Sequence, residues 1–278
     1  MNYVVFFPII LIISLTVGNL TFDKETLIVA HVHEHEYIML NTVLKHCAAD
    51  AIHIAGNSLP SRDDQVELLQ DSTCAEWIST QFPARCARFD SVVWGKISSK
   101  LPKHHLDFCM DTYEFPNMKG EKPRVFVSYN DAKGVCGSLG KRLCTEEEWI
   151  FACEGEEGLP YPYGYERDTA ACNIDHKWIE PNVKALQDPE RRVGELSRLW
   201  QGTPSGSMDL CVSPFGVHDM TGNIDELTTS VRKTGYRSVL KGGYWSTVRN
   251  RCRPSTRIHD ENFAFYQEGF RCCADILK

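Results

Sequence analysis

Three histidines near the start of the chain have a spacing that could bind a metal ion. They occupy every second position of HVHEHEY, as His31, His33 and His35. In a β-strand, residues at this spacing share one face, and imidazole is a common metal ligand. The alternative is a solvated strand edge or a mobile amino-terminal segment, which we favour because the sequence offers no further ligand.

Cysteine is the second residue type with chemical potential, since the chain contains twelve. Zinc ribbons hold their metal through C-x-x-C pairs, and this sequence has no such pair. A large and even number of cysteines is typical of disulfide-bonded proteins of oxidising compartments. The sequence therefore predicts disulfide bonds rather than a metal-thiolate cluster.

Composition and the amino-terminal residues predict an exported globular protein. The 278 residues are 42% apolar and carry a formal net charge of -7, without a local Lys/Arg cluster, which argues against nucleic acid as a partner. Residues 1–19 are typical of a signal peptide, because an apolar run precedes the first charged residue. We expect a secreted or periplasmic location. The alternative is an anchor formed by residues 3–20, and only an uncleaved segment would bring the protein to a membrane.

Local patterns divide the remaining chain at about residue 104. Residues 20–104 form a Cys-containing amino-terminal region, in which 62–82 has a helical pattern. Residues 123–129 are rich in β-branched and aromatic residues and predict a strand. A helix that ends at Gly140 should follow, with one inward face formed by Ala132, Val135, Cys136 and Leu139.

The next helix has a recognisable start. Thr145 is expected to cap its amino terminus, with Glu148 three residues later completing a capping box. Trp149 and Cys153 then lie one turn apart on the same face. Cys136 and Cys153 should therefore both point inward from consecutive helices.

Five motifs in order give the chain a resemblance to a known family. They are DAKGVCGSLGKRLCTEEEWIFACEG, PYPYG, FGVHDMTGNIDEL, VLKGGYW and GFRCC. Together they resemble the formylglycine-generating enzymes, or sulfatase-modifying factors, and in particular a Cys-rich extracytoplasmic bacterial branch. The resemblance covers residues 105–278. It implies a compact α+β domain related to C-type lectins, with little regular secondary structure and with disulfide bonds.

The resemblance also implies part of the disulfide framework. Cys136 should pair with Cys272, and Cys153 with Cys252. The other eight cysteines are not assigned by it, although Cys272 and Cys273 cannot readily bridge each other. These eight are Cys47, Cys74, Cys86, Cys109, Cys144, Cys172, Cys211 and Cys273.

Calcium is the cofactor that the resemblance implies. The family's ligand positions fall on the carboxylates of Asp219 and Glu226 and on the carbonyls of Gly222 and Ile224. Oxygen donors on a glycine-containing turn suit this ion. The alternative is a polar turn with solvated carboxylates. Asn173 and the carbonyl of Ile174 match part of a second calcium site.

The copper chemistry of the family lacks its ligands here. Formylglycine-generating enzymes oxidise a peptide cysteine with O₂ and a copper(I) ion held by two thiolates, because a soft metal requires sulfur donors. The matching interval, YWSTVRNR, is shorter and contains no sulfur. In addition, the family's W-E-W pattern reads Asp225-Glu226-Leu227. Copper is therefore not expected.

A ligand groove could remain without the metal. The resemblance places Tyr244, Trp245, Arg249 and Arg251 along the substrate groove, with Asp225 facing it. Aromatic and arginine side chains suit a peptide or a carboxylate-bearing small ligand. The alternative is that Trp245 and Arg251 pack or pair inside the core, and the sequence leaves both readings open.

Two functions follow from these features. We favour a non-catalytic, exported binding or structural module that is stabilised by calcium. The alternative is an oxidoreductase that modifies a protein cysteine or a small thiol through a different site. Whether the chain is an enzyme at all is not decided by its sequence.

Overall fold

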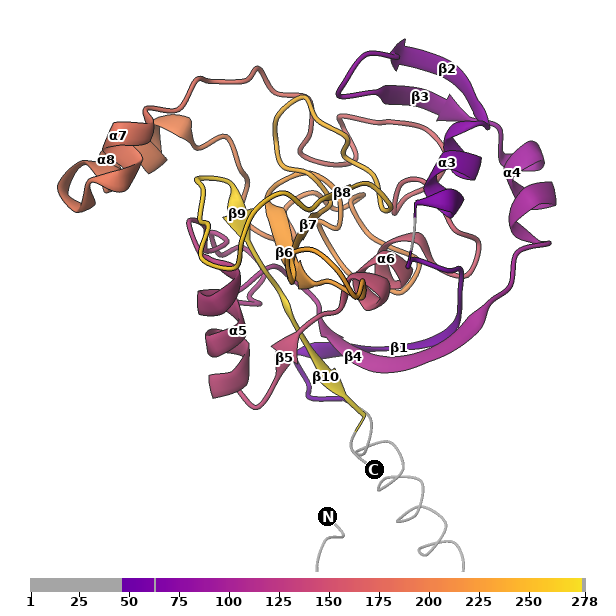
Figure 1. Ribbon diagram of the computed structural model, residues 1–278, viewed down its shortest axis with the longest axis horizontal. Helices are drawn as coiled ribbons and strands as arrows, with labels where there is room; N and C mark the ends of the chain where they lie inside the picture. The colour runs from indigo at the N-terminus through magenta and orange to yellow at the C-terminus, as the bar shows by residue number, and fades with distance from the viewer. Residues whose placement is uncertain (1–46, 63, 277–278) are drawn as a thin grey trace, which may run out of the picture. The chain divides into compact units, whose positions relative to one another are not determined.

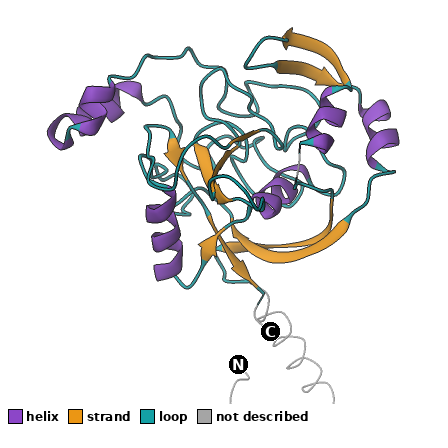
Figure 2. Cartoon of the chain, viewed as in Figure 1, coloured by secondary structure: helices purple, strands orange, loops and turns teal. Residues whose placement is uncertain are grey.

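The computed structural model describes residues 47–62 and 64–276. The histidines of HVHEHEY and the expected signal or anchor lie outside these residues. Among the described residues, no helix has the length and apolar character needed to cross a bilayer. Short helices and strands joined by long loops make up the chain (Figure 2), which confirms the predicted α+β class with little regular structure.

The largest sheet joins the two ends of the described chain. Strand β1 (Ala51–Ser58) pairs antiparallel with β4 (His104–Asp111) over eight residues. Strand β10 (Cys272–Asp275) lies between β4 and β5 (Arg142–Leu143). Figure 1 shows β1 and β4 running side by side below the centre of the domain. The boundary expected at residue 104 therefore does not separate two structural units, because β4 begins there and pairs with β1.

A second sheet carries the residues of interest. Its order is β8 (Ser255–Thr256), β7 (Ser238–Lys241), β6 (Asp225–Thr229) and β9 (Glu268–Gly269). Only the β6 and β9 pair among these is parallel. A separate hairpin, β2 (Cys74–Ser79) and β3 (Arg85–Phe89), lies at the upper edge of Figure 1.

Helix α6 (Glu146–Glu154) is the central helix, and its start was predicted correctly. Thr145 and Glu148 form the expected capping box. Trp149 and Phe151 are fully buried in a cluster with Ile54 of β1 and Met110 of β4. Fully burying one large apolar side chain is worth about 1.5–3 kcal/mol. Helix α6 therefore packs its apolar side chains against strands β1 and β4.

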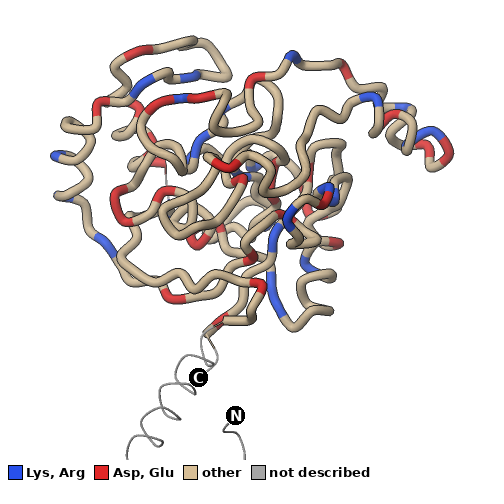
Figure 3. The backbone as a smooth tube through the Cα atoms, turned by 180° about the vertical axis from the view of Figure 1, so that it is seen from behind, with Lys and Arg blue, Asp and Glu red and all other residues tan. Residues whose placement is uncertain are grey.

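The other helices lie around this core. They are α3 (Gln65–Asp71), α4 (Ser91–Ser98), α5 (Tyr129–Ser138), α7 (Val183–Gln187) and α8 (Pro189–Leu199). Helix α5 buries Ala132 and Cys136 as expected, whereas Leu139 is 55% exposed. Figure 1 shows α7 and α8 projecting from the domain, and Figure 3 shows acidic and basic residues interspersed along the tube.

Two predicted elements are wrong. Residues 123–129 form no strand, since Phe126 has a φ of 60° and Ser128 caps helix α5. The apolar side chains there pack against the core from an irregular backbone, so composition misled the prediction. The helix expected over 62–82 ends at Asp71, and β2 follows. The bond between Cys74 and Cys86 holds β2 against β3.

All twelve cysteines form disulfide bonds, and the two pairs implied by the family resemblance are among them. Cys136 is bonded to Cys272, and Cys153 to Cys252. The remaining pairs are Cys47–Cys109, Cys74–Cys86, Cys144–Cys273 and Cys172–Cys211. Cys272 and Cys273 thus connect strand β10 to helix α5 and to the start of helix α6.

A buried ion pair completes the core. Arg271 is 1% exposed and donates to both carboxylate oxygens of Glu226, at 2.7 and 2.6 Å. Its guanidinium also donates to the carbonyls of Asp111, Thr112 and His218. A buried charge is tolerated only with such a full set of partners.

Removing a long-range disulfide should destabilise the protein more than removing a short-range one. The chain-entropy model gives about 4.7 kcal/mol for a loop near 100 residues and about 3 kcal/mol for one near 15. The Cys153–Cys252 bond spans 99 residues and the Cys74–Cys86 bond only 12. We expect the double Cys→Ala variant of the first pair to lose about 2 kcal/mol more in denaturant unfolding. Equal losses for the two pairs would contradict this expectation.

Replacing Arg271 should destabilise the core strongly. Arg271→Met leaves the Glu226 carboxylate buried without its cation, which costs about 3–5 kcal/mol. The double variant Arg271→Met/Glu226→Gln should recover part of this loss, because no buried charge remains. Arg191→Met, which removes an exposed partner of Asp188, is the control and should change little. Denaturant unfolding measures all three, and no recovery in the double variant would argue against the ion pair.

Candidate functional site

Two glycines start the segment that forms one side of the candidate site. Gly242 and Gly243 have φ values of 83° and 71°. A Cβ at Gly242 would lie 2.8 Å from the carbonyl oxygen of Met220, so only glycine fits there. Beyond them, the side-chain amide of Asn250 donates to the carbonyl of Tyr244 at 2.6 Å. This bond closes the loop 244–250.

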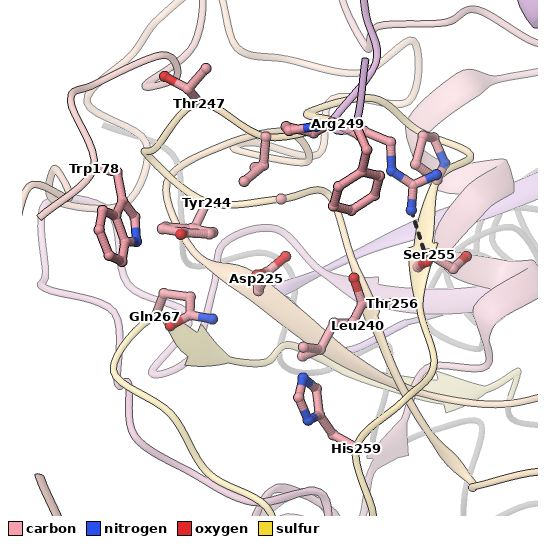
Figure 4. A pocket seen from close by; sticks show the side chains of 15 residues that line it. Trp178, Asp225, Leu240, Tyr244, Thr247, Arg249, Ser255, Thr256, His259 and Gln267 are labelled. Atoms are coloured by element: carbon pink, nitrogen blue, oxygen red, sulfur yellow. Dashed lines mark hydrogen bonds between the residues drawn. The ribbon is translucent and has the colours of Figure 1, made fainter. Parts of the chain in front are cut away.

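A pocket of about 360 Å³ opens beside this loop (Figure 4). Its volume is within the range of small-molecule sites. The walls come from the β2–β3 connection, the segment before α7, strands β6 to β8 and the segment before β9. The residues that line it are Phe82, Pro83, Trp178, Asp225, Leu240, Gly243, Tyr244, Thr247, Val248, Arg249, Pro254, Ser255, Thr256, His259 and Gln267.

Three of the five expected groove residues line this pocket, namely Asp225, Tyr244 and Arg249. The other two lie in the core. Trp245 is 1% exposed, with its ring 4.9 Å from that of Trp200. Arg251 is 3% exposed and pairs with Asp71 of helix α3 at 2.5 Å. Trp245 and Arg251 therefore pack and pair inside the core, which was the alternative expected for them, and do not line the pocket.

Arg249 lines the pocket, but its guanidinium already pairs with a carboxylate of the protein. Its guanidinium lies 3.3 Å from the carboxylate of Glu67 and donates to the carbonyl of Ser255 at 3.2 Å. It also faces the ring of Phe82, at 5.7 Å. A ligand carboxylate would therefore have to compete with Glu67 for this guanidinium.

Asp225 also lines the pocket, and no cationic side chain of the described residues is paired with its carboxylate. The side chain of Gln267 and the main-chain amide of Gly243 lie near its carboxylate as polar neighbours that lower its pKa. Burial, with the nearby charge of Glu226, raises the pKa of Asp225 to about 7. Next to it, burial and the charge of Asp225 raise the pKa of Glu268 to about 9. Around Asp225 the pocket therefore has two neighbouring carboxyl groups, Asp225 and Glu268, and no cation from the described part of the chain paired with them.

Sequence reasoning missed several lining residues, because loops distant in the chain supply them. Trp178, His259 and Gln267 carry no motif that would connect them with Asp225. Gln267 is 9% exposed, and its Oε1 has no hydrogen-bond partner among the described residues. The parallel pairing of β6 with β9 is the feature that brings Gln267 next to Asp225.

The residues expected to bind calcium do not form a fitting site. Both oxygens of Glu226 accept from Arg271, and one also accepts from the indole of Trp149 at 2.9 Å. A calcium ion bound there would face a guanidinium at close range. Asp219 accepts from the amide of Gly206 at 2.6 Å. Glu226 therefore uses its charge within the core rather than for a metal.

Gly222 and Ile224 lie on the turn before β6, and the second expected site is part of the same packing. A Cβ at Gly222 would lie 2.4 Å from the carbonyl oxygen of Asn173, which shows how closely these segments approach. That carbonyl accepts from the amide of Asn223 at 2.9 Å, and the Asn173 side chain donates to Asn223 at 3.0 Å. Ile174 is buried next to Cys172 and Cys211. Within the described residues, no group of three or more His, Cys, Asp or Glu side chains is placed to hold a metal.

Glu114 is a buried carboxyl that sequence reasoning did not single out. It accepts from the side chains of Ser205 and Asn223, at 2.7 and 2.8 Å. Burial and the charges of Asp219 and Glu226 raise its pKa well above the usual range, and burial raises the pKa of Asp219 to about 6. The signal was an acidic residue within the apolar YEFPN segment.

Comparisons with known proteins agree with this architecture. The model of the sulfatase-modifying factor enzyme 1-like domain matches residues 78–276, which is most of the chain. The inactive C-alpha-formylglycine-generating enzyme 2 of Bos taurus is 32% identical over 165 residues, covering 56% of this chain and 51% of the relative. The formylglycine-generating enzyme of Mycobacterium tuberculosis is 29% identical over 184 residues, covering 56% of this chain and 58% of that enzyme.

Among solved structures, CarF covers 82% of this chain and 98% of its own, with a TM-score of 0.49 and 14% identity. The chain spans about half the length of the curated relatives that it matches. Because the family model covers most of the residues, and because the expected motifs lie on its disulfide-bonded α+β frame, the chain belongs to the sulfatase-modifying factor family, as the sequence motifs predicted.

Proposed function

We propose that this protein is a non-catalytic member of its family that binds a small ligand or a peptide side chain in the pocket beside Asp225. One observation carries the proposal. All twelve cysteines are bonded in pairs, so none is left as a thiolate. A copper(I) site of the family type needs two thiolates, and disulfide sulfur does not replace them.

The relatives support this proposal. Two of them, from Bos taurus and Mus musculus, carry names that describe inactive formylglycine-generating enzymes. A protein can therefore keep the fold of this family without the family's catalytic activity. The pocket gives the frame a feature that a purely structural role would not require.

The six disulfides indicate an oxidising compartment. We place the protein outside the cytoplasm, as a secreted or periplasmic protein. Within such a compartment, free thiols would be exposed to oxidation, and paired cysteines would stabilise the domain.

An activity assay tests the absence of catalysis. The protein, loaded with copper(I), is incubated in air with a sulfatase-type cysteine peptide, and aldehyde formation is followed by mass spectrometry. We expect no aldehyde, because no thiolate pair is present to hold the ion. The formylglycine-generating enzyme of Mycobacterium tuberculosis serves as the active control. Aldehyde formation by this protein would instead support the alternative, an oxidoreductase with a different site.

A chelator tests the calcium stabilisation that the family resemblance implied. A ligand that binds only the folded state raises the melting temperature, so its removal lowers it. Because Arg271 already neutralises Glu226, we expect EDTA and added calcium to leave the melting temperature unchanged. A fall with EDTA that calcium reverses would restore the expected site at Asp219 and Glu226. The variant Asp219→Asn would then show whether that carboxylate is a ligand.

A further inference from the structure

We propose that the pocket beside Asp225 binds a primary ammonium group, as on a lysine side chain or a small alkylamine. This inference rests on the proposed binding function and names the chemical class of its ligand. Asp225 would be the counter-ion, and Gln267 Oε1 a second acceptor. Of the two ligand classes expected from the sequence, a peptide and a carboxylate-bearing ligand, it replaces the second, which depended on Arg249 and Arg251.

Charge is the first argument. Arg251 pairs with Asp71, and Arg249 contacts Glu67, so both arginines are compensated within the protein. The pocket's histidine, His259, stacks on Phe263 with ring centroids 3.9 Å apart, and burial lowers its pKa. The two arginines therefore have other partners, and a lowered pKa favours the neutral form of His259, so none of the three neutralises Asp225.

The groups around Asp225 are acidic or neutral. They are the carboxyls of Glu226 and Glu268 and the phenols of Tyr244 and Tyr266. Glu226 is neutralised by Arg271, and the raised pKa of Glu268 keeps it protonated at neutral pH. The charge that the pocket offers to a ligand is consequently that of Asp225, and a cation is its natural partner.

An unpaired acceptor is the second argument, and it is independent of charge. The side chain of Gln267 lies beside Asp225 and helps to lower the pKa of that carboxyl, and the main-chain amide of Asp225 donates to the Gln267 carbonyl at 3.0 Å. The side-chain oxygen of Gln267, Oε1, is buried and has no partner among the described residues. Leaving a buried acceptor without a donor costs about 1–3 kcal/mol. A ligand N–H would remove that cost.

The two arguments together select a primary ammonium group. It carries a positive charge for Asp225 and several N–H donors, one of which can reach Gln267. A quaternary ammonium carries the charge without donors, and a neutral alcohol donates without the charge. Figure 4 shows the Gln267 amide below the rings of Tyr244 and Trp178, next to Asp225. The indole of Trp178, which is 52% exposed, offers a face to a cation.

Calorimetry with the disulfide-bonded full chain tests the proposal at about pH 8, where a carboxyl with a pKa near 7 is ionised. The main probe is Nα-acetyl-lysine N-methylamide. Its norleucine and glutamate analogues and tetramethylammonium are the comparison ligands. We expect the lysine probe to bind at least about tenfold more tightly than any of these, as for a charge-assisted hydrogen bond. n-Butylamine distinguishes a free amine, which would bind equally well, from a side chain within a peptide.

Variants of the pocket give the second readout. Asp225→Asn keeps the shape and should weaken lysine binding about tenfold or more. Trp178→Ala, at an exposed position, should weaken it several-fold and is safe for folding. Asp209→Asn, which removes an 86% exposed carboxylate elsewhere, is the matched control and should have no effect.

Three results would overturn the inference: no saturable binding of the lysine probe, equal binding of norleucine, or unchanged affinity in both pocket variants. None of them bears on the copper assay. Tighter binding of the glutamate analogue would overturn the choice of ligand but leave a non-catalytic binding protein in place. Aldehyde formation would contradict the proposed function whatever the pocket binds.

Discussion

The interaction on which the structure depends is the buried contact of Arg271 with Glu226. A guanidinium without access to water must have every N–H near an acceptor, and Arg271 achieves this with Glu226 and three main-chain carbonyls. Those acceptors belong to β6, the end of β4 and the loop at His218. The three segments must therefore come together around Arg271 to accept hydrogen bonds from its guanidinium. Disulfides from Cys272 and Cys273, the two residues that follow Arg271, then connect the same point to α5 and to the start of α6.

The pocket follows from this constraint through strand β6. Side chains alternate across a strand, so neighbouring residues face opposite sides. Glu226 points to Arg271, and Asp225 therefore points away from that pair, into the pocket. The position of Asp225 is fixed by the core although its side chain takes no part in it. Residue 225 can therefore change in type, and with it the ligand that the pocket binds, while the core around Glu226 and Arg271 stays the same.

Local signals in the sequence were reliable, whereas long-range partners could not be predicted. The capping box of Thr145 and Glu148 depends on residues three apart, and the structure contains it. The strand expected over 123–129 was wrong, because packing determined the backbone there rather than β-propensity. Arg249 and Arg251 suggested an anion site, because their partners Glu67 and Asp71 lie about 180 residues earlier in the chain. Likewise, Gln267 reaches Asp225 only through the pairing of β6 with β9.

Asp225 is difficult to explain as a structural residue. Burial raises its pKa from 3.8 to about 7, so the unfolded chain releases this proton more readily than the folded one. Asp225 consequently lowers the free energy of unfolding as the pH rises from about 4 to 7, and this loss persists above that range. The family's pattern has an aromatic residue at this position, which would carry no such penalty. A bound cation would reverse the effect, because it stabilises the ionised form in the folded state alone. The proposed ammonium ligand would therefore offset the destabilisation that ionised Asp225 causes in the folded protein.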